Sequence, residues 1–171
     1  LARMRRRYNA QTAMERLTAL RRLMPQVQFS ADVIAGFPGE SEEDFAESLS
    51  FVREAEFLHL HVFPYSRRPG TEAADMPDQI DPSEKARRVA LLCRTGEQTR
   101  DAILARLAAG RENVTVLTEE TKDGFVLGHS EAFVPCRIPL RDLLPSQHRG
   151  QLVACKITGY HDGALTVAPR E

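Results

Sequence analysis

The chain has 171 residues, a formal net charge of −1 at pH 7 and 42% hydrophobic residues, which is typical of one ordinary globular domain or two small ones. It lacks an apolar run that could span a membrane and the apolar stretch of a signal peptide, so we expect a cytoplasmic protein. It also lacks a phosphate-binding loop with its lysine, a GxGxxG motif and a nucleophile elbow, which argues against phosphoryl transfer, nicotinamide chemistry and serine hydrolysis.

The positive charge is concentrated at the start of the chain, where the first thirty residues hold seven arginines and one glutamate. Apolar residues at helical spacing follow and predict a helix over residues 9–24, capped by Asn9 and stopped by Pro25. Residues 27–35, VQFSADVIA, then indicate a strand covered on both faces toward its end.

A second helix and strand follow in the same order. Ser41, with Asp44 three residues later, predicts a helix start through a near capping box, and residues 57–63, FLHLHVF, alternate as a strand. This αβαβ order predicts a parallel sheet, in which ligands bind at the carboxyl ends of the strands. Because two strands are too few to bury such a sheet, and because the chain begins at Leu1 inside an arginine run, we expect a fragment that lacks upstream strands.

The composition changes after a long helix expected from about residue 83 to 109, which Gly110 ends. Five short β segments separated by turns follow and predict a small closed barrel similar to an oligonucleotide-binding fold. We therefore predict α/β plus small β architecture, with a domain boundary that separates residues 1–109 from residues 110–171.

Histidines and cysteines offer only weak candidates for metal ligation. His59 and His61 lie two apart on one strand face, but no third ligand is nearby in the sequence, so a structural role is favoured over a metal site. Cys93, Cys136 and Cys155 are too far apart for a local ligand pair, and we expect them to be buried small hydrophobic residues. We assign no metal ligand.

One stretch, DVIAGFPGES at residues 32–41, is an apolar strand that breaks at a glycine, turns and restarts as a helix. It combines with MRRRYNA at 4–10, HVFPYSRRPGTEAADMPDQI at 61–80 and the small β domain into a pattern that resembles the tRNA methylthiotransferases of the radical S-adenosylmethionine superfamily. The histidine before VFPYS resembles the branch that acts on N6-threonylcarbamoyladenosine beside the anticodon, rather than the isopentenyl-adenosine or ribosomal-protein branches.

This resemblance implies a fold and partners. Residues 1–109 would be the carboxyl-terminal part of a parallel (β/α) radical-SAM barrel, and residues 110–171 would be a TRAM-like RNA-binding β-barrel. The implied partners are the anticodon stem-loop of tRNA and an upstream region of the same protein.

The resemblance also implies six residues that bind S-adenosylmethionine: Arg6, Asp32, Ile34, Gly36, Glu40 and Phe63. Arg6 would pair with the methionine carboxylate, and Ile34 and Gly36 would pack backbone against the adenosine, where a glycine permits close approach. Asp32 would point into a polar barrel lumen, and Glu40 would reach a ribose or the arginines. A structural hydrogen bond for Asp32 and a helix-start role for Glu40 remain as alternatives.

Residues expected to contact the tRNA substrate fall into two groups. Tyr65, Ser66 and Arg67 follow the second strand, at the implied mouth of the site. In the small barrel the candidates are Phe133, Arg137 and Lys156, to which Arg141 and His129 could add, with Tyr160 as an alternative stacking residue. Residues 111–171 carry seven basic and eight acidic side chains, so a barrel that only packs on the enzyme remains the alternative.

The chain departs from the family in lacking the CxxxCxxC motif that holds the radical-generating 4Fe-4S cluster, and its three cysteines are not grouped for cluster ligation. We therefore expect the iron-sulfur clusters to be bound by the missing upstream part, the fragment alone to be inactive, and none of its residues to be catalytic. A non-enzymatic RNA-binding or scaffold module is the competing interpretation.

Overall fold

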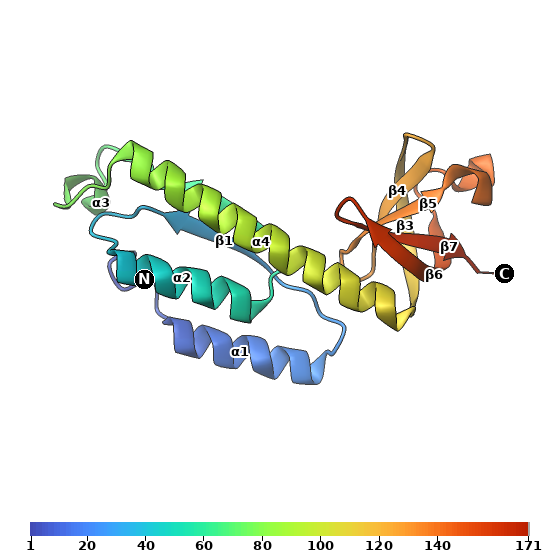
Figure 1. The fold of residues 1–171 in the computed structure, drawn as a ribbon, viewed down its shortest axis with the longest axis horizontal. Helices are drawn as coiled ribbons and strands as arrows, with labels where there is room; N and C mark the ends of the chain where they lie inside the picture. Colours follow the sequence, from blue (N-terminus) through green and yellow to red (C-terminus); the bar gives the residue numbers. More distant parts are fainter. Residues whose placement is uncertain (171) are drawn as a thin grey trace. The chain divides into compact units, whose positions relative to one another are not determined.

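The computed structural model describes residues 1–170 (Figure 1). Its internal contacts divide the chain into two units, which meet between Thr99 and Arg100 inside a long helix. That helix ends at Gly110, as the sequence predicts, and the functional domain boundary near Gly110 stays a prediction.

The first unit is built on two parallel strands joined by a helix, as the αβαβ order predicts. Strands β1 (Ser30–Ala35) and β2 (His59–Pro64) pair in parallel, with Asp32 beside His61 and Ile34 beside Phe63. The helices are α1 (Ala10–Leu23), α2 (Glu42–Ala55), the single turn α3 (Glu72–Asp75) and α4 (Pro82–Gly110).

Both predicted helix starts are confirmed, because each is closed by a reciprocal capping box. The side chain of Asn9 accepts from the amide of Thr12 at 2.8 Å, and Ser41 Oγ accepts from the amide of Asp44 at 3.1 Å. In return, the side chain of Asp44 accepts from the amide of Ser41 at 2.9 Å. These bonds satisfy amides that the first helical turn leaves without partners, so the sequence sets the point where α2 leaves the turn after β1.

The expectation that β1 is covered on both faces toward its end is wrong for this chain. Ala35 is buried and Val33 is half-buried, because α2 and α4 pack Phe45, Val52 and Leu92 against that face. On the opposite face Ile34 is 41% exposed. Asp32 shares the exposed face, and its position in a polar barrel lumen stays a prediction.

Helix α1 is formed where the sequence predicts it, but none of its residues is buried. Its apolar side chains are half-buried or exposed, and Leu23 at its end is 79% exposed. No helix within residues 1–170 has the length and apolar character needed to cross a membrane.

The second unit contains the predicted closed five-stranded barrel, in the order β3-β4-β5-β7-β6. Its strands are β3 (Asn113–Lys122), β4 (Phe125–Ser130), β5 (Pro135–Pro139), β6 (Leu152–His161) and β7 (Ala164–Pro169). Two short 3-10 turns, Leu140–Asp142 and Pro145–Gln147, connect β5 to β6. Neighbouring strands are antiparallel except β5 and β7, and the inward side chains, such as Val126, Ile138 and Val167, are buried.

Candidate functional site

The chain makes a tight turn directly after β1, which we call the strand-end turn and define as residues 36–40. Gly36 and Gly39 both have positive φ, +73° and +72°, a region that favours glycine. The amide of Glu40 donates to the carbonyl of Phe37 at 2.9 Å, and the amide of Gly36 donates to Oε2 of Glu40 at 2.7 Å. Glu40 therefore closes the turn onto its own first residue.

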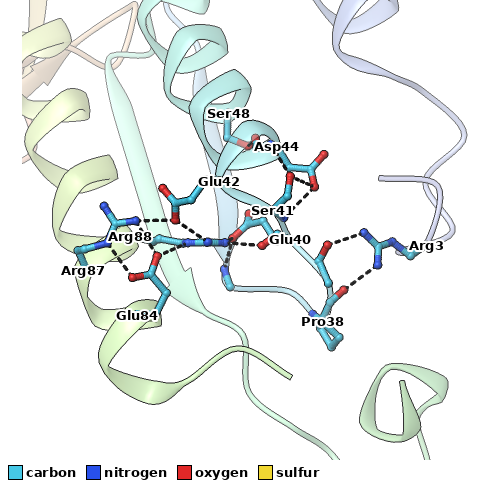
Figure 2. A network of polar contacts seen from close by, with 12 residues as sticks. Arg3, Pro38, Glu40, Ser41, Glu42, Asp44, Ser48, Glu84, Arg87 and Arg88 are labelled. Carbon is cyan, nitrogen blue, oxygen red and sulfur yellow. Dashed lines mark hydrogen bonds and ion pairs between the residues drawn. The ribbon is translucent and has the colours of Figure 1, made fainter. Parts of the chain in front are cut away.

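Two basic side chains lie where these glycines lack a Cβ. A methyl group on Gly36 would overlap Cγ of Lys85, and one on Gly39 would overlap the guanidinium of Arg3. Arg3 donates to the carbonyls of Pro38 and Gly39 at 3.0 and 2.9 Å (Figure 2). The glycines thus admit the chain's own cations. Gly36 is buried in the described chain, and its close approach to a cofactor stays a prediction.

A buried arginine joins the strand-end turn to two helices (Figure 2). Arg88, on α4, is 3% exposed and donates through Nη1 to both the carbonyl and Oε2 of Glu40, at 2.8 and 2.7 Å. It also donates to Glu84 at 2.6 Å and to Glu42 at 2.8 Å, and it lies over the ring of Phe45. Burial lowers the pKa of Arg88, but the bonds to Glu40, Glu84 and Glu42 outweigh burial and raise it overall.

Glu84, in the first turn of α4, accepts hydrogen bonds from two arginines. Arg87 donates to it through Nε and Nη2, each at 2.7 Å, beside the bond from Arg88. These bonds, that of Arg87 foremost, lower the pKa of Glu84 from its ordinary 4.5 to about 2. The same pairing with Glu84 and Glu42 raises the pKa of Arg87.

The exposed face of β1 and β2 brings together three of the residues predicted to bind the cofactor. Ile34 and Phe63 are register neighbours and are 41% and 50% exposed, and Asp32 lies two residues before Ile34 on the same face. His61 is the register neighbour of Asp32, a contact position that the sequence analysis did not assign to the site.

Tyr65 packs against the strand-end turn. Its amide donates to the carbonyl of Ala35 at 2.8 Å, its ring meets Phe37 edge to face at 5.3 Å, and the ammonium of Lys85 lies 5.2 Å from its ring centre. Its hydroxyl is buried and has no hydrogen-bond partner among the described residues.

Arg6, the predicted partner of the methionine carboxylate, is exposed, and its role stays a prediction. The arginine that contacts the strand-end turn is Arg3, while Arg5 forms an exposed ion pair with Glu72. Sequence reasoning missed Arg3 because nothing local distinguishes it from the neighbouring Arg5, Arg6 and Arg7. Ser66 and Arg67 are exposed in the connection after β2.

On the barrel, Phe133 is presented outward by an unusual backbone. It has φ +60°, is 72% exposed and lies with its ring centre 5.3 Å from that of His129. His129 in turn contacts Oε2 of Glu119 through Nδ1 at 3.0 Å. Phe133 therefore leaves a flat aromatic surface open to stacking.

The predicted cations of the barrel share its outer surface. Arg137 on β5 donates to the hydroxyl of Thr166 on β7 at 3.1 Å, and its guanidinium lies 4.6 Å from the ring centre of Phe125. Lys156 on β6 pairs with Ala168, two residues beyond Thr166. Arg141 and Tyr160 are also exposed, with Arg141 near Asp142.

An exposed apolar row beside Phe133 was missed from the sequence. Leu117 is the cross-strand neighbour of both His129 and Leu152, and the two leucines are 43% and 73% exposed. Each leucine adjoins an inward-facing valine, and two consecutive apolar residues in a barrel strand place one of them outside. That signal would have identified the row.

The cysteines do not fit the role of cluster ligands. Cys136 and Cys155 are buried inside the barrel as predicted, and burial raises their pKa values to about 12 and about 11, so both thiols stay protonated. Cys93 is half-buried in the first unit, and residues 1–170 contain no group of three His, Cys, Asp or Glu that could hold a metal ion.

No protein-family model matches the chain, but curated proteins do. It is 47% identical over 98 residues to the threonylcarbamoyladenosine tRNA methylthiotransferase MtaB of Bacillus subtilis, which covers 57% of this chain and 22% of that protein. It is 34% identical to the MtaB of Rickettsia prowazekii, over 96% of this chain and 36% of the relative. It is also 34% identical to the tRNA-2-methylthio-N(6)-dimethylallyladenosine synthase of Ehrlichia canis, over 97% of this chain and 37% of the relative.

The chain thus spans between about a fifth and two fifths of the length of these relatives. The similarity to the last two extends over nearly the whole chain, including both units. The chain belongs to the tRNA methylthiotransferase family.

Proposed function

We propose that this chain supplies part of the S-adenosylmethionine site and part of the tRNA-binding surface of a cytoplasmic tRNA methylthiotransferase. The reaction would add a methylthio group to carbon 2 of N6-threonylcarbamoyladenosine beside the anticodon. The observation that carries the proposal is the gathering of Asp32, Ile34 and Phe63 on one exposed face at the ends of two parallel strands, in a chain similar to named methylthiotransferases.

This face suits the cofactor chemically. Ile34 and Phe63 offer exposed apolar surface that an adenine ring would cover, and the carboxylate of Asp32 can accept hydrogen bonds from a hydroxyl or ammonium group. Arg6 would supply a cation for the carboxylate. S-adenosylmethionine would supply the radical chemistry when bound, and the residues here would bind and orient it.

The 4Fe-4S clusters that the family uses would be held outside this chain. The two barrel thiols are buried and protonated, and Cys93 is far from both in the sequence, so the three cysteines are not grouped for cluster ligation. The fragment alone is therefore proposed to be inactive.

The tRNA would be contacted in two places. Tyr65, Ser66 and Arg67 follow β2, where the modified nucleoside would meet the cofactor. Phe133 and its neighbour His129 would stack on an unpaired base. The basic side chains that would support this contact are Arg137, Arg141 and Lys156.

Two modified adenosines remain as candidate substrates, one for each of two branches of the family. His61, directly before VFPYS, favours threonylcarbamoyladenosine. The similarity over 97% of the chain to a dimethylallyladenosine synthase supports the isopentenyl-type adenosine as the second candidate.

Two exposed phenylalanines allow a reciprocal test in the full-length protein that contains this chain. Phe63→Ala is expected to weaken S-adenosylmethionine binding roughly tenfold, because it removes apolar contact area, and to leave tRNA affinity nearly unchanged. Phe133→Ala is expected to do the reverse, with tRNA affinity falling roughly tenfold through loss of stacking. Equilibrium binding of each ligand to both variants is the measurement.

Each variant serves as the control for the other, since both remove an exposed aromatic side chain. Unchanged cofactor affinity in Phe63→Ala would contradict the strand-end site. Unchanged tRNA affinity in Phe133→Ala would support instead a barrel that only packs on the enzyme.

A further inference from the structure

Arg88 is buried although its side chain carries a full charge. A buried cation is costly unless its hydrogen-bonding groups are paired, and Arg88 meets this requirement with three carboxylates and one carbonyl. The three carboxylates come from different places in the chain: the strand-end turn, the first turn of α2 and the first turn of α4. One side chain thus joins three segments.

A comparison with the neighbouring Arg87 separates two roles of this network, the contact between α4 and α2 and the contact to the strand-end turn. Both arginines bind Glu84 and Glu42, and both lie over Phe45, so both hold α4 against α2. Only Arg88 reaches Glu40. The contact to the strand-end turn is therefore specific to Arg88, while the helix contact is shared.

Glu40 passes this contact to the end of β1. Its Oε2 accepts from Nη1 of Arg88 and from the amide of Gly36, both at 2.7 Å, while its carbonyl accepts from Arg88 at 2.8 Å. Arg88 holds both the main chain and the side chain of Glu40, which leaves the carboxylate aimed at Gly36. The peptide that Gly36 shares with Ala35 lies next to exposed Ile34.

We propose that Arg88 is a positioning residue for the cofactor site: through Glu40 it fixes the amide of Gly36 and so the carboxyl end of β1 that faces S-adenosylmethionine. This inference rests on the proposed function. A positioning residue acts without touching the ligand, so its removal should change affinity through the mobility of the turn.

The test uses the full-length protein that contains this chain and four variants: Arg88→Met, Arg88→Lys, Glu40→Gln and, as the matched control, Arg87→Met. One readout is amide hydrogen exchange in the peptide that contains Gly36, and the other is the Kd for S-adenosylmethionine. Arg88→Met and Glu40→Gln are expected to speed exchange at Gly36 and to raise the Kd about tenfold, the loss seen when an outer-shell partner is removed at metal sites. Arg88→Lys should recover part of both effects, and Arg87→Met should change neither.

Three results would overturn the inference. Unchanged exchange at Gly36 in Glu40→Gln and Arg88→Met would show that Arg88 does not fix the turn. Equal losses of affinity in Arg87→Met and Arg88→Met would show that the network only holds the helices together. Faster exchange at Gly36 with unchanged Kd in both Glu40→Gln and Arg88→Met would contradict the proposed cofactor site. Arg88 would then fix the turn without affecting cofactor binding.

Discussion

The glycines of the strand-end turn differ from other glycines of positive φ in what lies beside them. Gly70 has φ +79° and no atom within 4 Å of the position a Cβ would take. Gly36 has φ +73°, and Lys85 occupies that position. The same substitution therefore meets backbone strain alone at Gly70, but strain together with overlap at Gly36.

Gly36→Ala is expected to lower the free energy of unfolding more than Gly70→Ala. The left-handed conformation costs alanine roughly 1–2 kcal/mol at either position. Overlap with Lys85 adds about 1–3 kcal/mol at Gly36. Chemical denaturation of the two variants measures both changes in the same unit, and equal destabilisation would contradict the packing of Lys85 on the turn.

For the contacts between the strand-end turn and distant basic side chains, the sequence identified only the residue in the turn. Glu40 stood out beside a glycine turn, but Arg88 lies 48 residues later in an ordinary helical pattern and carried no local signal. Lys85 and Arg3 were missed for the same reason. Pairing between distant residues depends on how elements pack, which local spacing does not encode.

The first turn of α4 joins α2 by ion pairs that depend on pH. Because the pKa of Glu84 falls from its ordinary 4.5 to about 2, the folded state holds this carboxylate ionised where the unfolded chain would protonate it. The stabilisation is complete above about pH 4.5 and is lost as the pH falls toward 2.

Glu84→Gln should therefore flatten the fall in stability between pH 4.5 and 2. The urea midpoint, measured from pH 6 downward, is the readout, with Glu43→Gln, exposed in the first turn of α2, as the control. A wild-type curve as steep as that of Glu84→Gln over this range would show that Glu84 is not held ionised by Arg87 and Arg88.

Elements set by local chemistry were predictable. The caps at Asn9 and Ser41 and the barrel turns at Asp123-Gly124 and Asp162-Gly163, where both residues have positive φ, follow from residue type. The coverage of β1 was not predictable, because an apolar run indicates burial but not which element provides it. Its exposed Ile34 was therefore expected to be covered.

Across the whole molecule, the β-barrel was predicted with its closure, while its outer surface was predicted only in part. Alternation separates inward from outward residues, and Arg137 and Lys156 each lie between two buried residues of their strands. The exposed row of Leu117 and Leu152 departs from the alternation of apolar and polar residues, and Phe133 has a left-handed backbone and lies two residues before β5 begins. A near balance of acidic and basic residues told nothing about where charges of one sign gather.

The measurement that tests the central claim most directly is mass spectrometry of tRNA nucleosides from cells that lack the gene containing this chain, compared with cells in which the gene is restored. The account predicts loss of 2-methylthio-N6-threonylcarbamoyladenosine, accumulation of its precursor without the methylthio group, and recovery on restoration. Unchanged levels of every methylthio-adenosine would contradict the proposed function, and loss of the isopentenyl-type nucleoside alone would contradict the proposed substrate.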